Sequence, residues 1–304
     1  MEASLTISEP LTLSGPAGAI AVAPTRGAKI TSLTDANGTE WLAPCRTVIG
    51  DPSVFVDAEM GGWDECAPTI DAGVLPDGRS VGDHGDVWNR PWHVLAHSEA
   101  ELTCRVTVPH LGFTLERHIT ATPTGFRLDY RAVLLAGAPD LPFLWAAHPQ
   151  FLAPDRIEVP GLSAVVVTHP SRSDEPHPWP SQPWSRQPPG GAGMTGAAKY
   201  WAHTPALPKG VTLHRGGAHL GLSWGGEPLR GLAIWVDPGV FADSDVIAVE
   251  PATGLGSTAW ADAVTALVPH DEVAVLTADE PLHWWLRVDF STLSGPLGGH
   301  ARTD

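Results

Sequence analysis

The chain has 304 residues and a formal net charge of −16, from 34 acidic and 18 basic residues. So acidic a protein is a poor partner for nucleic acid or anionic lipid, because both are themselves negatively charged. A hydrophobic content of 43% allows a substantial core, and the length fits one large domain or two small ones.

Cysteine usage and the N-terminus narrow the class of protein further. Cys45, Cys66 and Cys104 form an odd set without CxxC spacing, which is unlike a disulfide framework or a zinc site. Residues 1–6 lack the basic and apolar regions of a secretion signal, and no run approaches the ~18 apolar residues of a membrane span. We therefore expect a cytoplasmic protein, monomeric or homodimeric, that needs no cofactor and has no nucleic acid or membrane partner.

Short runs in which apolar and polar residues alternate predict strands along the chain, whereas helical periodicity is weak. In chain order the predicted strands are residues 11–14, 20–23, 29–33, 102–108, 113–121, 125–135, 157–159, 164–168, 211–213, 220–224, 232–236, 246–249, 272–277 and 284–290. The 32 glycines and 30 prolines punctuate these runs at short intervals, as turns between strands do. This pattern predicts an all-β protein, either a sandwich or a barrel.

Two regions, residues 60–92 and 169–201, do not fit the strand pattern and are predicted to be long loops. Loops of this length within a compact domain are usually functional or disordered. Residues 294–304 have the composition of a flexible tail. No segment resembles a linker, so residues 1–293 are predicted to form a single domain.

Two titratable residues each follow an apolar run and precede a proline. His148 follows residues 143–147, and Glu250 follows residues 246–249. Because proline biases the residue before it toward an extended backbone, each side chain would be held stiffly at the end of a strand. A carboxylate base with an imidazole acid suits proton transfer near neutral pH. The alternatives are a hydrogen-bonded core histidine and a surface glutamate in a turn.

A third candidate, His84, lies in a Gly-Asp-His-Gly segment, where the flanking glycines permit close approach of a ligand. Trp88 and Arg90 follow it and offer an indole for the apolar face of a sugar and guanidinium donors for its hydroxyls. The alternative is a polar loop with tryptophans that pack in the core.

Residues 61–68 place Trp63, Asp64 and Glu65 directly after two glycines. This segment is predicted to be a loop that faces the substrate, and the alternative is a tight bend filled by the indole. His169, Asp174 and His177 lie near one another in sequence, but prolines break their spacing, so we predict no metal site there.

Together these segments resemble the galactose mutarotase-like proteins, or aldose 1-epimerases. Residues 27–42 are similar to the opening strands of that family, and His84 with Gly85 resembles its first histidine segment. Residues 147–151 (Ala-His-Pro-Gln-Phe) resemble its His-Pro-Tyr-Phe motif, and residues 249–253 (Val-Glu-Pro-Ala-Thr) its Glu-Pro-Gln-Thr motif. The matches run in order over nearly the whole chain.

The resemblance implies a large antiparallel β-supersandwich and a metal-independent isomerase that interconverts the α and β anomers of a sugar. Glu250 would be the base that takes the proton from the anomeric hydroxyl, and His148 the acid that protonates the ring oxygen. His84 would donate a hydrogen bond near that oxygen. The partner would be a small-molecule carbohydrate.

Two departures from the family pattern bear on the substrate. Residues 61–68 stand where many members carry an arginine-containing stretch, and Gln150 replaces the tyrosine of His-Pro-Tyr-Phe. The chain is therefore more similar to a divergent branch with Gly-Trp-Asp/Glu-Glu-Cys segments, and galactose itself is not implied. The expected substrate-binding residues are Trp63, Asp64, Glu65, Trp88, Arg90 and Gln150.

Two other functions fit the same residues. One is a different isomerase or ring-chemistry enzyme on the same scaffold, which would be favoured if both Asp64 and Glu65 lined the cleft. The other is a carbohydrate-binding protein without turnover, which would hold Glu250 and His148 too far apart to contact one sugar ring.

Overall fold

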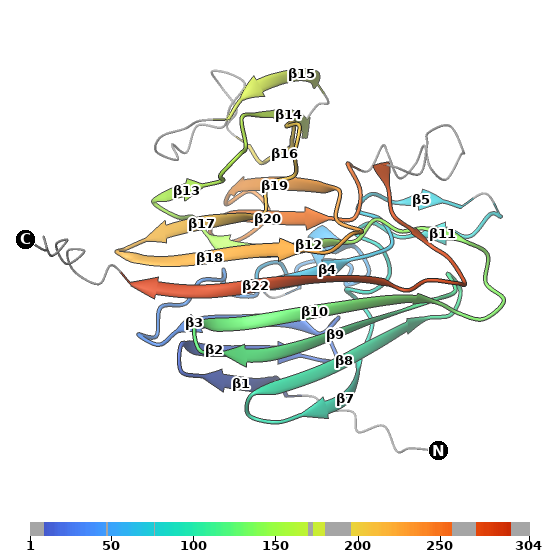
Figure 1. Cartoon of the computed structure of the whole chain (residues 1–304), viewed down its shortest axis with the longest axis horizontal. Coiled ribbons are helices and arrows are strands. Elements are labelled where there is room, and N and C mark those ends of the chain that lie inside the picture. Colours follow the sequence, from blue (N-terminus) through green and yellow to red (C-terminus); the bar gives the residue numbers. More distant parts are fainter. Residues whose placement is uncertain are drawn as a thin grey trace, which may run out of the picture.

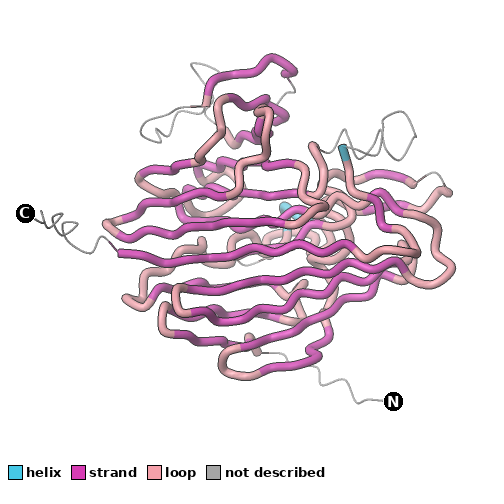
Figure 2. Tube along the Cα trace, viewed as in Figure 1, coloured by secondary structure: helices cyan, strands magenta, loops and turns pink. Residues whose placement is uncertain are grey.

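Strands with alternating burial build two large antiparallel sheets in the computed structural model of the chain (Figures 1 and 2). The structure describes residues 9–46, 48–75, 77–169, 173–179, 196–256 and 272–292. The predicted tail, residues 294–304, and part of the predicted loop 169–201 lie outside these ranges. The all-β prediction is confirmed, and the two-sheet arrangement is that of a sandwich.

The first sheet has ten strands. In spatial order they are β1 (Leu11–Gly15), β2 (Gly18–Ala23), β3 (Lys29–Asp35), β4 (Trp63–Cys66), β12 (Ala146–Leu152), β20 (Asp245–Ala252), β19 (Gly231–Pro238), β16 (Ala198–Ala202), β14 (Ala164–His169) and β15 (Ser173–Pro178).

The second sheet has eight strands. Their order is β13 (Arg156–Glu158), β17 (Gly210–Arg215), β18 (Ala218–Gly225), β22 (Leu282–Thr292), β10 (Gly125–Leu134), β9 (Phe113–Thr122), β8 (Glu101–Val108) and β7 (His93–His97). Two small ribbons pair β5 (Gly73–Val74) with β6 (Ser80–Val81) and β11 (Leu141–Pro142) with β21 (Val275–Leu276). A short 3-10 helix, η1, spans Phe55–Asp57.

The predicted strands lie within the observed ones except at residues 272–277, where only Val275–Leu276 pair, and at strand ends that differ by one residue. The prediction is wrong for the two regions assigned to loops. Residues 60–92 contain β4, a central strand of the ten-stranded sheet, and residues 169–201 contain β15 and β16. These strands are short and carry charged residues or proline, so alternation alone does not reveal them.

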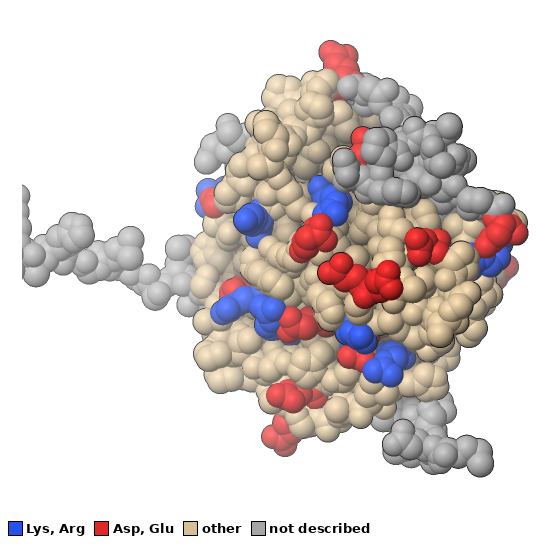
Figure 3. All heavy atoms as spheres, turned by 45° about the vertical axis from the view of Figure 1, so that its right-hand side comes forward, with Lys and Arg blue, Asp and Glu red and all other residues tan. Residues whose placement is uncertain are grey.

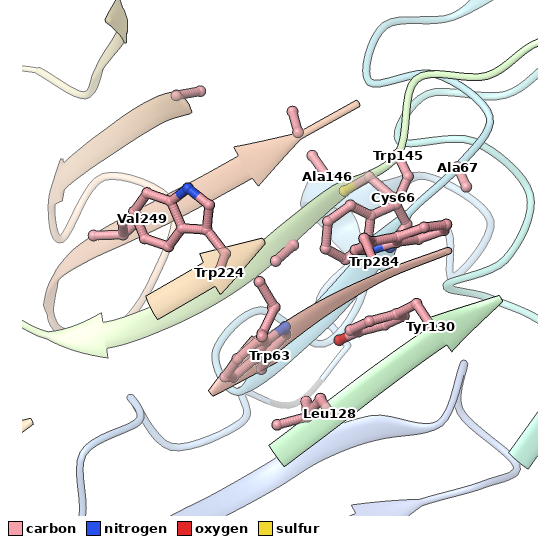
Figure 4. Packing of buried hydrophobic residues seen from close by; sticks show 14 of the residues in the cluster. Trp63, Cys66, Ala67, Leu128, Tyr130, Trp145, Ala146, Trp224, Val249 and Trp284 are labelled. Atoms are coloured by element: carbon pink, nitrogen blue, oxygen red, sulfur yellow. The ribbon is translucent and has the colours of Figure 1, made fainter. Parts of the chain in front are cut away.

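Aromatic side chains fill the space between the two sheets (Figure 4). Tyr130 of β10 stacks on Trp284 of β22 with ring centroids 5.3 Å apart, and Trp145 lies 4.9 Å from Trp284. Trp63 of β4 is fully buried in the same core. Burial of such large aromatic surfaces supplies much of the driving force for packing one sheet on the other.

A buried carboxylate joins the sheets through this core. Glu65 of β4 accepts hydrogen bonds from Arg117 Nη1 (2.7 Å) on β9, Tyr130 Oη (2.9 Å) on β10 and Trp145 Nε1 (2.8 Å). Arg117 and Glu65 are almost fully inaccessible to solvent. The charge is tolerated inside the protein because it is paired and its lone pairs are hydrogen-bonded.

The described part of the chain contains no helix with the length and apolarity that a membrane span requires.

Replacing Arg117 with methionine should destabilise the fold, because Glu65 would lose its only cationic partner while remaining buried. We expect the free energy of unfolding to fall by about 3–5 kcal/mol, as for other buried pairs that lose one partner. Urea unfolding measures the loss. The matched control is Arg105→Met, which removes an exposed arginine paired with Glu116 and should cost about 0–1 kcal/mol. Equal losses in the two variants would contradict a special role for the buried pair.

Candidate active site

Three titratable side chains form a row across the central strands of the ten-stranded sheet. Asp64 of β4 lies opposite His148 of β12. The pairing of β12 with β20 matches Ala146 with Ala252 and Gln150 with Ala248, which places His148 opposite Glu250. Their side chains lie on the face turned away from the eight-stranded sheet, here called the site face. His148 Nε2 is 3.6 Å from Glu250 Oε1.

The structure corrects the expectation that His148 and Glu250 stand at strand ends. Both lie inside central strands, and each is followed by its proline within the strand. Between the pairs Ala146–Ala252 and Gln150–Ala248 the register of β12 and β20 is kept, but the residues in between are not paired. Proline lacks the N–H that a ladder hydrogen bond requires, so the two prolines open the sheet locally instead of ending it.

Two lysines accompany this row: Lys29 is buried, and the Lys199 side chain is 14% exposed. Lys199 Nζ of β16 is 2.8 Å from Glu250 Oε2, and Lys29 Nζ of β3 is 3.0 Å from Asp64 Oδ2. Each lysine therefore balances one carboxylate of the row. The sequence reasoning missed both residues. The signal was present, because both lie in predominantly apolar segments, and lysine is almost never buried there unless it is paired.

His148 is uncharged at neutral pH. Burial, followed by the nearby positive charge of His84, Lys199 and Lys29, lowers the pKa of His148 well below its ordinary value. Its Nδ1 is buried without a hydrogen-bond partner among the described residues. A neutral imidazole with one free nitrogen can accept or donate a single hydrogen bond to a bound molecule.

His84 reaches the site from a tight turn. Its backbone is left-handed, with φ 58°, and its N–H donates to the carbonyl of Ile70. Gly85 follows with φ 74°, and a Cβ there would lie 1.9 Å from the carbonyl oxygen of Ala67. The glycines were predicted to permit close approach of a ligand, but Gly85 instead packs against the backbone of Ala67 at the end of β4, which fixes the turn. The ring centroids of His84 and His148 are 5.7 Å apart.

Phe55 covers both imidazoles. Its ring stacks on His84 with centroids 3.6 Å apart and meets His148 edge-on at 5.5 Å. Phe55 is only 4% exposed although it belongs to the short helix η1 in a loop. The sequence offered no signal for this contact, since Phe55 stands in a loop without periodicity.

Gln150 lies on the site face two residues beyond His148. Its side chain is fully buried, and both amide atoms lack hydrogen-bond partners within the described residues. Buried amides are rarely left unsatisfied, so these atoms are available to a polar ligand or to water. This placement agrees with the predicted role in substrate binding, which stays a prediction.

Trp63 and Glu65 are not on the site face. Side chains alternate along β4, so Trp63 and Glu65 point into the core between the sheets while Asp64 points to His148. The expectation that Trp63 and Glu65 contact the substrate is therefore corrected, and of this segment Asp64 remains a candidate.

Trp88 and Arg90 follow His84 in the chain, and the structure does not bring them into the row. Trp88 is buried edge-on to Phe55 at 5.1 Å, and its Nε1 donates to the carbonyl of Asp83, so it supports the cover over the imidazoles. The Arg90 guanidinium lies 3.9 Å from Asp86 and is partly exposed. The substrate-binding roles of both residues stay predictions.

No group of three or more His, Cys, Asp or Glu side chains in the described ranges is arranged to hold a metal ion. Of the three residues considered from sequence, His169 packs against Trp235, and the side chain of Asp174 lies outside the described ones. On the face that Figure 3 shows, Lys and Arg are interspersed with Asp and Glu, and its described residues form no continuous basic surface.

No family model matches the chain, and no curated protein matches it in sequence. Solved structures do resemble it. The Slr1438 protein from Synechocystis sp. PCC 6803 is 18% identical with a TM-score of 0.72, over 96% of this chain and 99% of that one. A protein provisionally assigned as an aldose 1-epimerase, from Escherichia coli K12, is 18% identical with a TM-score of 0.68, over 93% and 99%. A galactose mutarotase-like protein from Lactobacillus casei is 18% identical with a TM-score of 0.65, over 93% and 100%.

At this level of identity the likeness establishes the fold alone. The chain has the galactose mutarotase-like β-sandwich fold, as the sequence motifs predict.

The uncharged state of His148 should make stability depend on pH. Below its ordinary pKa of 6.5 the unfolded chain protonates this histidine, whereas the folded protein does not until far lower pH. The unfolded state then binds more protons, so stability falls as the pH falls below about 6.5. In His148→Gln the fall should be shallower, by up to about 1.4 kcal/mol per pH unit.

Urea unfolding of both proteins between about pH 7.5 and pH 5 measures the difference. Burial raises the pKa of Asp64 and of Glu65, which adds the opposite slope, but both proteins share those groups. His97→Gln, at an exposed position on β7, controls for the loss of an imidazole as such. Parallel curves for the wild type and His148→Gln would show that His148 is not held uncharged.

Proposed function

We propose that the protein is an aldose 1-epimerase-like isomerase that interconverts the α and β anomers of a sugar or sugar derivative. The observation that carries the proposal is the approach of His148 Nε2 to within 3.6 Å of Glu250 Oε1 on one buried face. A carboxylate and an imidazole at this spacing can both contact one sugar ring. Both groups stand on rigid central strands, which suits positioned proton transfer.

The reaction moves one proton off the sugar and one onto it. The Glu250 carboxylate removes the proton of the anomeric hydroxyl, so that the C1–O1 bond becomes a carbonyl. The bond from C1 to the ring oxygen breaks, and its electron pair stays on the ring oxygen, which takes up a proton. Rotation about C1–C2 followed by the reverse steps closes the ring on the other face.

In this proposal His148 acts on the ring oxygen. The lowered pKa of His148 favours an uncharged imidazole, which polarises the ring oxygen by donating its N–H. It can release a full proton only after taking one up from the substrate or solvent. In this proposal His84, whose ring stacks on Phe55, donates a second hydrogen bond near the ring oxygen.

For each of the two alternative functions raised by the sequence, one observation argues against it. A binding protein without turnover was expected to hold Glu250 and His148 far apart, but they approach to 3.6 Å. A different chemistry was favoured if Asp64 and Glu65 both lined the cleft, but Glu65 bonds to Arg117 in the core. These observations support the epimerase proposal over the other two.

Replacing Glu250 with glutamine should lower the rate of anomer exchange by about 10²–10⁴-fold, because the amide cannot accept the proton. Exchange NMR or polarimetry on a panel of aldoses and sugar acids measures the rate. His148→Gln should lose a similar factor. Glu280→Gln, at an exposed position, is the matched control and should keep the wild-type rate.

Two results would count against the proposal. A wild-type rate in Glu250→Gln, on a sugar that the wild type turns over, would remove Glu250 from the mechanism. Saturable binding of sugars by the wild-type protein without anomer exchange would identify a binding protein instead.

A further inference from the structure

Lys199 is a largely buried cation that the proposed proton transfer does not yet use. It lies on β16, and β19 separates that strand from β20, where Glu250 lies. Lys199 stands opposite Trp235 of β19, and Glu250 stands opposite Ala233, two residues away on the same face of β19. Because Ala233 has no side chain beyond Cβ, the lysine can extend across β19. Its Nζ lies 2.8 Å from Glu250 Oε2.

The surroundings leave Lys199 as the charge partner of Glu250. Glu250 is 1% exposed, and a carboxylate that deep is costly unless it is paired. His148 lies further away and carries no charge at neutral pH, because its pKa is lowered by burial and by its cationic neighbours. Lys29, the other buried lysine, pairs with Asp64 instead.

The interaction also acts in the other direction, from Glu250 on Lys199. Burial alone would lower the pKa of Lys199, but the Glu250 carboxylate outweighs that effect and raises it. Other titratable groups that act on the pair include His148 on β12, Cys66 on β4, Asp71 in the segment after β4 and Asp83 beside His84. The thiol of Cys66 is neutral, since burial and the Glu250 charge raise its pKa well above the ordinary value.

We propose that Lys199 is a positioning residue of the site, whose ammonium holds Glu250 in the ionised form and in a fixed orientation beside His148. Its catalytic consequence rests on the proposed function, because a base must be ionised before it can take the proton of the anomeric hydroxyl. The ionisation itself does not depend on any substrate.

The test is a direct titration of Glu250. Proteins labelled with carbon-13 at the glutamate carboxyl are titrated by NMR, and the Glu250 signal is assigned by its absence in Glu250→Gln. In Lys199→Met, Glu250 should titrate about 1–3 pH units higher than in the wild type, the range by which an adjacent opposite charge shifts a carboxyl. Lys199→Arg should restore most of the wild-type behaviour. Lys209→Met, at the remaining lysine of the chain, which is exposed, should change nothing.

A double-mutant cycle keeps the proposal testable if Lys199→Met folds poorly. If the loss arises from an uncompensated Glu250 charge, adding Glu250→Gln should restore stability, whereas a merely structural lysine would leave the double variant as unstable as the single one. An unchanged Glu250 titration in folded Lys199→Met, or no rescue in the double variant, would overturn the proposal.

These outcomes are separate from those of the activity assay. If the protein proves to bind sugars without turnover, the titration still reports on Lys199. If anomer exchange is confirmed, the decrease of kcat/KM toward low pH should begin at a higher pH in Lys199→Met than in the wild type. In Lys199→Arg the decrease should begin near the wild-type pH.

Discussion

The arrangement of the site depends on the burial of one carboxylate, that of Glu65. It takes hydrogen bonds from Arg117, Tyr130 and Trp145 inside the sandwich, and it can stay ionised only if β4 presents it inward. Because side chains alternate strictly along a strand, this fixes Asp64 on the opposite face, in line with His148. A slip of one residue in β4 would bury Asp64 without these donors and remove Glu65 from them. The network that joins the sheets therefore also sets which groups face the candidate substrate.

On the site face, charge is balanced pair by pair. Lys29 offsets Asp64 and Lys199 offsets Glu250, while His148 stands between the two carboxylates without a charge of its own. Cations on both sides of the imidazole oppose its protonation more than the carboxylates favour it. The result is a buried surface with the Glu250 carboxylate, a neutral hydrogen-bonding ring and the unsatisfied amide of Gln150. Such a surface carries little net charge, which suits the uncharged sugar of the proposed function.

The sequence was sufficient for the fold class and for the titratable residues, for identifiable reasons. Long strands such as β9 and β10 alternate over most of their ten residues, so their pattern is unambiguous. His148 and Glu250 stood out because each combines an apolar run, a titratable group and a proline. β4 was missed because both of its faces are buried and both carry acids, which breaks the alternation of polarity. Lys199 and Phe55 were missed because their roles arise from contacts over long sequence separations, which local patterns do not contain.

The two prolines explain where in the sheet such a site can form. A proline in a central strand normally argues against the strand, and the sequence analysis placed His148 and Glu250 at the ends of the apolar runs that precede the two prolines. The structure keeps them because each strand remains paired on its other side: Pro149 lies opposite Trp63 of β4, and Pro251 lies opposite Leu232 of β19. The ladder is interrupted only between β12 and β20, where His148 and Glu250 face each other. The backbone of His148 is thus held by β4, and the backbone of Glu250 by β19. The separation of the two side chains is set by their own contacts and by any molecule that binds between them. A continuous ladder at this point would also fix the spacing of the two backbones by hydrogen bonds. The interrupted ladder leaves that spacing freer to adjust when, as proposed, a sugar ring opens and closes.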